Sequence, residues 1–535
     1  MKFFLSLSAV FFLSLSALAG KPFSNLENLK NSLGFTKYYN EDNNGRRLRI
    51  AVLDKGFAGY ENEIGRTLPQ DTYYYPGPNQ PAPTPTATAG GTETDHGLRM
   101  AQILTAFMTN DLKASQWEPE LFLYNVFGYT NFKAAIDDMI EQQVDLVLYS
   151  EVWEYGGNHD GTGFINAQVT RATNAGIIWV NAAGNFGLTT YNSKIEIGQD
   201  SWVKLPNQNQ ALAIRCEAGK QKKCPVKIVL SWNDFKNDVN IGTDKDLDLA
   251  LTDDLLNIVQ SSALKQTKED AERPGYSKYP REIIQAELKP GNYFLRVKAR
   301  SENFGSRDTL RITVDGEGVQ MPSHSVDETL LNPADNTTVI TVGASDSDRS
   351  SSSRRLGKPD LMAPSSIKLT EGGEYRGSSN SAAIVAAGLA ILKSNEPKKT
   401  RKDLIEATRS TANQFWDRRG LSLNLLRFGP TGPGCFENAR MQVPAYLQDI
   451  IMKGGVLVQT TASVRVMVPF DPIFAAPYLR RNMINDMIVA MPQGGYAVFP
   501  RFGIIPQGAA EIFQRPYEAG LCQLPAGMGS TFYLP

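Results

Sequence analysis

The sequence predicts an α/β protein whose parallel sheet carries helices on both faces, interrupted by an inserted antiparallel β sandwich and followed by a β-rich C-terminal module. Three observations predict this arrangement. Apolar strands alternate with helical segments over residues 47–190, the helical pattern is absent over residues 191–321, and the alternation returns over residues 322–428. Strands that alternate with helices form crossover units, and these build a parallel sheet that is covered on both faces.

The N-terminus has the pattern of a leader followed by a short segment. Residues 1–19 contain a lysine, an apolar run and the small residues Ala17 and Ala19 just before Gly20, which is typical of a cleaved signal peptide. An uncleaved anchor is disfavoured, since the run is short and interrupted by serines, and no later stretch is apolar enough to span a bilayer. Residues 20–46 form a short N-terminal segment. We therefore expect an exported, soluble chain that is secreted or periplasmic.

Residues 47–190 are expected to form the first part of the α/β domain. The predicted strands are 48–54, 120–126, 144–150 and 176–185, and the predicted helices are 96–108, 131–143 and 164–176. Functional sites in such sheets lie at the carboxyl ends of the strands. Residues that follow these strands are therefore the first candidates for chemistry.

The rest of the chain divides into three parts. Residues 191–321 contain short alternating strands such as "KIVLSWND" and "NYFLRVKAR" between turn residues, which indicates an antiparallel sandwich. Residues 322–428 resume the α/β pattern, with a helix beginning near Ser379. Residues 429–535 are rich in glycine and proline and contain β-like runs, so we expect a separate C-terminal module.

Composition and cysteines narrow the class of protein. A net charge of -1 with 41% hydrophobic and 21% charged residues gives no basic excess that would favour nucleic acid. Four cysteines in an exported chain predict two disulfides. We expect Cys216 to pair with Cys224 and Cys435 with Cys522, although three connectivities are open. A zinc site is disfavoured because no Cys-x-x-Cys pair occurs and the chain has only three histidines.

Three residues stand where predicted strands end or helices begin: Asp54 after "RIAVL", His96 in "TDHGLRM", and Ser379 in "GSSNSAAIVAAGLAIL". On the last stretch alone, a capped core helix explains the serines without any chemistry. Taken together, the three residues are an orienting carboxylate, a base and a nucleophile at the edge of one sheet. A serine hydroxyl is a poor nucleophile unless an imidazole takes its proton, and that imidazole needs a carboxylate on its other nitrogen.

The blocks "AVLDKG", "DHGLRMAQI", "VNAAGNFG", "NPADNTTVITVGAS", "GKPDLMAPS" and "GSSNSAAIVAAGLAIL" occur in this order. In sequence and order they resemble the signature blocks of the subtilisin-like serine protease family, over about residues 47–190 and 322–415. The order Asp, His, Ser is also that of subtilisin. The resemblance implies a peptide-bond hydrolase that requires no cofactor for catalysis.

The resemblance also implies residue roles. Asp54 would orient His96, which would act as base and then acid, while Ser379 would form the acyl-enzyme. Asn185 would stabilise the oxyanion together with the backbone N–H of Ser379. Ser150 would anchor an extended substrate, with Gly184 as a further substrate contact.

Glu151 and Glu154 lie in the segment that would form one wall of the substrate cleft. There they would favour basic substrate side chains, or they are simply solvated.

The chain departs from the family pattern at several points. Ser378 replaces the usual threonine, Ala383 replaces a usual proline, and Lys55 follows the catalytic aspartate. Residues 20–46 are too few for the usual folding propeptide. Either the enzyme folds without one, or another segment such as the C-terminal module takes that role.

An acidic group in the predicted sandwich suits calcium. Alternation places Asp244, Asp246 and Asp248 on one face of a strand, and oxygen clusters of this kind bind calcium. An acidic, solvated edge explains the same residues.

We therefore predict an exported serine endopeptidase that acts on protein or peptide substrates, without nucleic acid or a membrane span after signal removal, and as a monomer. The alternative from another class is a catalytically silent subtilisin-like scaffold that binds partners at the cell surface. A third interpretation is an acyl hydrolase or peptide ligase that uses the same three residues.

Overall fold

The structure is a computed structural model. It describes residues 23–35, 47–78, 94–109, 119–206, 209–219, 223–268, 273–370, 372–411, 413–416, 422–425, 486–490 and 496–500. The predicted signal peptide, Cys435, Cys522 and most of the predicted C-terminal module lie outside the described residues.

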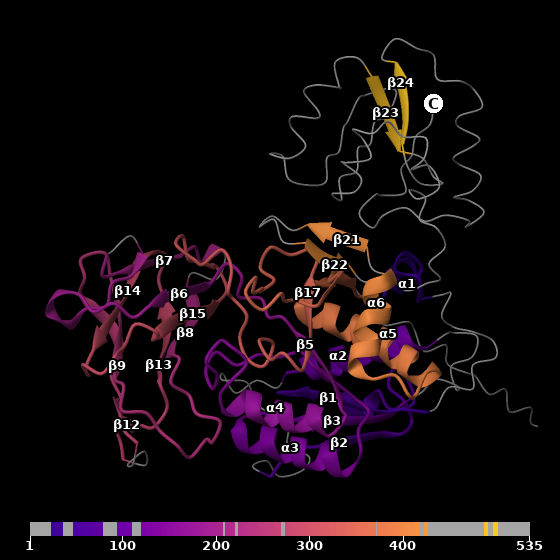
Figure 1. Ribbon diagram of the computed structural model, residues 1–535, viewed down its shortest axis with the longest axis horizontal. Helices are drawn as coiled ribbons and strands as arrows, with labels where there is room; N and C mark the ends of the chain where they lie inside the picture. Colours follow the sequence, from indigo (N-terminus) through magenta and orange to yellow (C-terminus); the bar gives the residue numbers. More distant parts are fainter. Residues whose placement is uncertain are drawn as a thin grey trace, which may run out of the picture.

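A nine-stranded sheet forms the centre of the α/β part (Figure 1). Its strands follow the order β2 (Thr72–Tyr75), β3 (Glu120–Asn125), β1 (Arg49–Asp54), β4 (Leu146–Tyr149), β5 (Ile178–Ala182), β17 (Ile340–Ala344), β18 (Leu361–Ala363), β22 (Ser422–Leu425) and β21 (Asn413–Trp416). Neighbouring strands are parallel except for the antiparallel pair β21 and β22.

Helices pack on both faces of this sheet. The helices are α1 (Leu26–Leu33), α2 (His96–Met108), α5 (Ser378–Asn395) and α6 (Arg401–Thr411) on one face, and α3 (Tyr129–Glu141) and α4 (Phe164–Asn174) on the other. Successive side chains of a strand point to opposite faces. In β1, Ile50 and Val52 accordingly belong to the core cluster of α2 and α5, whereas Ala51 and Leu53 belong to that of α3 and α4. The predicted parallel α/β fold is confirmed.

The strand order places a switch point beside β1. From β1 the chain passes through β2 and α2 to β3, with β2 and β3 on one side of β1, and then through α3 to β4 on the other side. Crevices outside the carboxyl ends of strands at such points are the usual ligand sites of α/β sheets. Asp54 ends β1 and Ser150 follows β4, so both residues lie at this crevice.

Two antiparallel sheets lie between β5 and β17 in the chain. One has the order β10 (Ile258–Ser262), β9 (Leu247–Thr252), β14 (Gly291–Ala299), β7 (Leu212–Cys216) and β16 (Val319–Gln320). The other has the order β13 (Arg281–Leu288), β8 (Cys224–Trp232), β15 (Thr309–Gly316) and β6 (Thr190–Lys194). Side chains from both sheets share one buried apolar cluster, as packed sheets do. The limits of a separate inserted domain stay a prediction.

The predicted disulfide between Cys216 and Cys224 is present, joining the end of β7 to the start of β8. Short elements complete the described chain: β11 (Lys265–Gln266), β12 (Tyr276–Ser277), β19 (Ile367–Lys368), β20 (Glu374–Tyr375), β23 (Asp486–Ala490), β24 (Tyr496–Pro500) and the 3-10 turns η2 (Tyr60–Asn62) and η4 (Gln199–Ser201).

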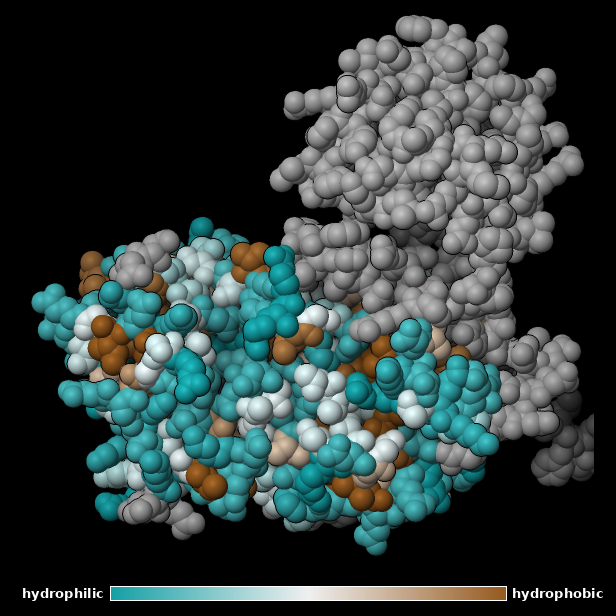
Figure 2. Space-filling view, in the orientation of Figure 1, coloured by the Kyte–Doolittle hydropathy of each residue, from teal (hydrophilic) through white to brown (hydrophobic). Residues whose placement is uncertain are grey.

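The face of the molecule shown in Figure 2 is mostly polar, and its hydrophobic residues lie in small separate groups. Among the described helices, none has the length and apolar character needed to cross a membrane.

Candidate active site

Asp54 and His96 meet at the carboxyl end of β1. The Asp54 side chain is fully buried, and its Oδ2 lies 2.7 Å from Nδ1 of His96, the first residue of α2. Gly97 permits this approach, since a Cβ there would lie 2.6 Å from both the Asp54 Cβ and the Gly56 carbonyl oxygen. The glycine after His96 therefore allows the start of α2 to pack directly against the end of β1.

A second carboxylate and a lysine flank this pair. Glu151 Oε1 lies 3.9 Å from His96 Nδ1, and Lys55 Nζ lies 2.7 Å from Glu151 Oε2. The backbone N–H of Lys55 also donates to Asp54 Oδ1 at 2.8 Å. Burial lowers the pKa of His96, but Asp54 and then Glu151 outweigh it and raise the pKa to about 9, against an opposing effect of Lys55. Burial likewise lowers the pKa of Lys55, and Glu151 raises it well above its usual value.

Ser379 is the second residue of α5. The residue that precedes the helix is Gly377, which makes no side-chain capping bond, so capping does not account for the serines. Ser378 Oγ instead accepts from the N–H of Gly184 at 3.0 Å, and Ser379 Oγ donates to the carbonyl oxygen of Ser150 at 3.0 Å. Within the described structure, no hydrogen bond joins Ser379 to His96.

Asn185 is fixed beside the start of α5. Its Oδ1 accepts from the N–H of Ser378 at 3.0 Å, and the described hydrogen bonds leave its Nδ2 without an acceptor. Gly377 has φ +149, a region that favours glycine, and a Cβ there would lie 3.0 Å from Asn185 Nδ2. The first N–H groups of a helix have no intrahelical partner. The Ser379 N–H and Asn185 Nδ2 are therefore two donors available to an anion.

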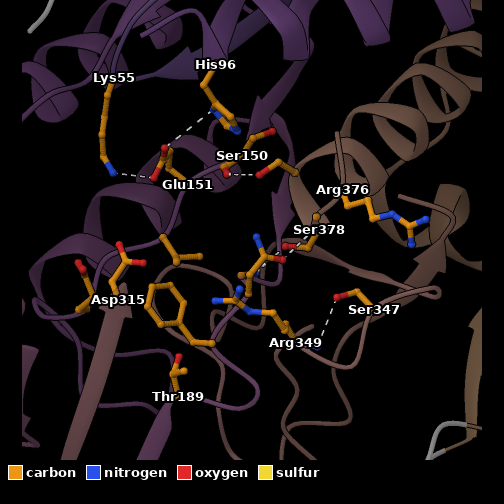
Figure 3. Close-up of a pocket in the computed structure, with 17 residues that line it drawn as sticks. Lys55, His96, Ser150, Glu151, Thr189, Asp315, Ser347, Arg349, Arg376 and Ser378 are labelled. Carbon is orange, nitrogen blue, oxygen red and sulfur yellow. Dashed lines mark hydrogen bonds and ion pairs between the residues drawn. The ribbon is translucent and has the colours of Figure 1, made fainter. Parts of the chain in front are cut away.

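These residues line one open cleft of about 470 Å³ (Figure 3). The structure brings together His96, Ser379, Asn185, Ser150 and Gly184 as cleft-lining residues, with Asp54 behind His96. The Ser150 hydroxyl is buried and has no described hydrogen-bond partner.

The cleft also contains residues that the sequence did not single out. Thr189 and Asp315 come from the start and end of the antiparallel region, and Ser347, Arg349 and Arg376 come from loops before α5. No local sequence pattern marks these positions, and Asp315 reaches the cleft only because the antiparallel sheets pack against the α/β part.

The two glutamates predicted in the cleft wall are both present, and both are ion-paired. Glu151 pairs with Lys55, and Glu154 Oε1 lies 2.8 Å from Lys227 Nζ of β8. The sequence leaves open that both glutamates are simply solvated. Their ion pairs show that neither carboxylate is free.

The calcium candidates do not form the predicted row on one strand. Only Asp248 lies in β9, which begins at Leu247, so Asp244 and Asp246 precede the strand. Asp244 pairs with Lys268 and accepts from Asn303, while Asp248 pairs with Arg300, so these carboxylates are drawn toward separate partners. Within the described chain, the group of three potential ligands whose atoms lie within 4.8 Å of one another is Asp54, His96 and Glu151. Calcium binding stays a prediction.

Comparison with known families identifies the segment around Ser379. A model of the subtilase family matches residues 296–430, which include Ser379 but not Asp54, His96 or Asn185. This match confirms the predicted resemblance to the subtilisin-like family and supports a serine-type peptidase. No curated protein sequence matches the chain.

Solved structures that resemble the chain include two proteases. The CspB protease of Clostridium perfringens is 15% identical with a TM-score of 0.45, and the match covers 75% of this chain and 97% of that protein. A cold-adapted subtilisin-like serine proteinase is 12% identical with a TM-score of 0.34, and the match covers 73% of this chain and 91% of that protein.

Proposed function

We propose that this chain, which matches the subtilase family around its nucleophile candidate, is an exported serine endopeptidase that hydrolyses peptide bonds through Asp54, His96 and Ser379. The observation that carries the proposal is the 2.7 Å contact between Asp54 and His96 in the cleft that Ser379 and Asn185 also line. Asp54 and Ser379 are more than 300 positions apart in the sequence, and their position at one cleft supports acyl transfer through these side chains.

The buried carboxylate determines the role of each imidazole nitrogen. An ionised aspartate only accepts hydrogen bonds, so Nδ1 of His96 carries the hydrogen that points at Asp54. Nε2 of the neutral ring then has a free lone pair for the proton of Ser379. Asp54 also stabilises the imidazolium that forms when this proton arrives.

Ser379 must turn its hydroxyl before it can react. In the free protein this hydroxyl donates to the Ser150 carbonyl, which is the predicted anchor of an extended substrate. A backbone N–H of a bound peptide would donate to the same carbonyl and compete with the hydroxyl. The Ser379 hydroxyl would then be free to rotate toward Nε2 of His96.

The acyl-enzyme step follows from these positions. Ser379 Oγ attacks the scissile carbonyl carbon while its proton passes to His96, and the developing oxyanion accepts from the Ser379 N–H and Asn185 Nδ2. His96 then gives the proton to the leaving amine as the peptide bond breaks. A water activated by His96 releases the acid and restores the Ser379 hydroxyl.

Export is part of the proposal. The N-terminal pattern of residues 1–19 and the disulfide between Cys216 and Cys224 both fit an oxidising compartment.

A fluorophosphonate probe tests the proposal on the protein from Gly20 onward. We expect labelling that maps to Ser379 and disappears in Ser379→Ala and His96→Ala. Ser381→Ala is the matched control, because Ser381 lies in the same helix and its hydroxyl donates to the Ala363 carbonyl, outside the cleft. Absence of labelling in folded protein, before and after limited proteolysis, would contradict the proposal and favour the binding scaffold. Faster turnover of esters than of peptides would favour an acyl hydrolase.

A further inference from the structure

Strand β15 of the antiparallel region places the carboxylate of Asp315 in the wall of the substrate cleft. Asp315 lies near the end of β15, is exposed, and lines the same cleft as His96 and Ser379 (Figure 3). None of the described hydrogen bonds or ion pairs uses its carboxylate. Asp315 is therefore a charge in the cleft without a direct partner among the described residues.

The neighbours of Asp315 contain more negative than positive charge. Lys227 lies opposite Asp315 in the register of β8 and β15, but its Nζ contacts Glu154 at 2.8 Å. The ammonium group of Lys227 thus pairs with Glu154, and no described ion pair joins it to Asp315. Desolvation at the cleft wall, and then repulsion from Glu154, raises the pKa of Asp315, while Lys227 lowers it.

The other charges of the cleft are arranged differently. Lys55 pairs with Glu151, and Arg376 Nε lies 3.0 Å from Glu374 Oε2. Arg349 also lines the cleft, and the described structure has no ion pair for its side chain. The cleft therefore contains one carboxylate, Asp315, and one guanidinium, Arg349, that each lack an ion-pair partner among the described residues.

We propose that Asp315 is a specificity residue that binds a lysine or arginine side chain of the peptide substrate. The cationic side chain would enter beside Asp315 and Glu154 and supply the positive charge that Lys227 alone does not provide. The inference rests on the proposed peptidase function and adds its substrate class. It also assigns the antiparallel region a direct part in substrate choice.

The expected effect is moderate, since Asp315 is exposed and a solvated ion pair is screened. We expect removal of its charge to lower the preference for a basic over a neutral side chain by about fivefold, which corresponds to a strong exposed pair. The preference should also weaken as salt is added, because exposed charges are screened by ions.

The test uses the full chain and paired fluorogenic peptides that differ only in lysine or norleucine at one position, with each position scanned in turn. We expect kcat/KM to favour lysine at one position, Asp315→Asn to reduce that ratio about fivefold, and Asp315→Glu to retain it. Arg349→Gln is the matched control, because it removes a charge of opposite sign from the same cleft and should not lower the ratio. Thermal unfolding of each variant shows that it is folded.

An unchanged ratio in folded Asp315→Asn, or no preference for lysine in the wild type at any position, would overturn the inference. Fluorophosphonate labelling of Ser379 in the same samples reports the proposed function separately. The paired peptides are also titrated against Ser379→Ala, so the charge preference is measured as a ratio of dissociation constants without turnover. Labelled protein without a charge preference rejects only the role of Asp315.

Discussion

At the scale of single residues, the proposed base lies beside two carboxylates. Asp54 bonds to His96, and Glu151 lies 3.9 Å from the same nitrogen with Lys55 holding its other oxygen. Both carboxylates stabilise the imidazolium, which is why the pKa of His96 rises to about 9 although burial alone would lower it. Below that pH most of the free enzyme carries a protonated His96, which cannot accept the Ser379 proton.

The first prediction concerns pH. Because only neutral His96 acts as base, kcat/KM should rise with pH to a midpoint near 9, the pKa of the free enzyme. Glu151→Gln removes one negative charge beside the imidazolium, so the midpoint should move to lower pH, by about 0.5 to 1 unit. Lys55→Met should move it to higher pH, because Lys55 opposes the protonated state. Initial rates on one peptide across the pH range measure both shifts, and an equal midpoint in all three proteins would contradict this account.

The second prediction concerns Asn185. Its Oδ1 is held by the Ser378 N–H, so its Nδ2 is directed by a fixed amide plane. Asn185→Ala should lower kcat by about 10² to 10³, or about 3 kcal/mol, with little change in KM, which is the known magnitude for the oxyanion-binding asparagine of subtilisin itself. Steady-state kinetics on a peptide substrate measures it. A loss confined to KM would instead assign Asn185 to ground-state binding.

At the scale of elements, α5 shows why the sequence predicts the helix that carries Ser379. Its run of small residues is buried against α2, β4, β5 and β17, so Ser379 is carried on a helix in the centre of the fold. The segment predicted as helix 96–108 is α2 with the same limits. The polar start and small apolar run of α5 and the apolar pattern of α2 are local, so they specify these helices without tertiary information.

Other elements could not be predicted because their structure depends on partners. The edge strand β2 consists of Thr72 and three tyrosines and lacks the apolar run of the central strands. Helix α1 has only a weak signal within the N-terminal segment, since it spans only eight residues. Asp315 in the cleft follows from strand pairing and packing far from the catalytic blocks. When residues distant in the sequence are brought together by packing, no local sequence pattern marks the contact.

The third prediction concerns the disulfide that joins β7 to β8. Cys216 and Cys224 close a loop with a sequence separation of 8, and both are buried in the core of the antiparallel sheets. The double variant Cys216→Ser/Cys224→Ser should lower the free energy of unfolding by about 2 to 3 kcal/mol, from the loop entropy that the bond removes. Denaturant unfolding under oxidising conditions measures the loss. Equal stability of variant and wild type would show that the bond contributes little.

At the scale of the whole molecule, the antiparallel region is tied to the wall of the cleft. Lys227 pairs with Glu154, and the guanidinium of Arg281 lies 3.8 Å from the ring centre of Tyr155. The Asn158 side chain also donates to the Phe235 carbonyl at 2.8 Å. The segment after Ser150, which carries the predicted substrate wall, is therefore held by the added sheets as well as by the α/β part.

The N-terminal segment is likewise built into the α/β core. Phe23, Leu26, Leu33 and Phe35 are buried in the same cluster as α2 and α5, and the Phe35 ring lies 5.0 Å from that of Phe107. Lys30 is buried as well and donates to the Thr109 carbonyl at 2.8 Å. From this packing we predict that the segment remains part of the folded enzyme and is not removed as a propeptide.

The last prediction follows from this packing. Phe35→Ala should lower the free energy of unfolding by about 3 to 5 kcal/mol, because it removes a fully buried ring and leaves a cavity against α2. Asn28→Ala is the matched control, since Asn28 is exposed on the same segment and should change stability little. N-terminal sequencing of the active enzyme gives the second measurement. We expect the mature chain to begin before Phe23, because removal of residues 23–35 would expose apolar surface of α2. Active, equally stable enzyme that begins after Phe35 would contradict this account and would assign the segment to a propeptide after all.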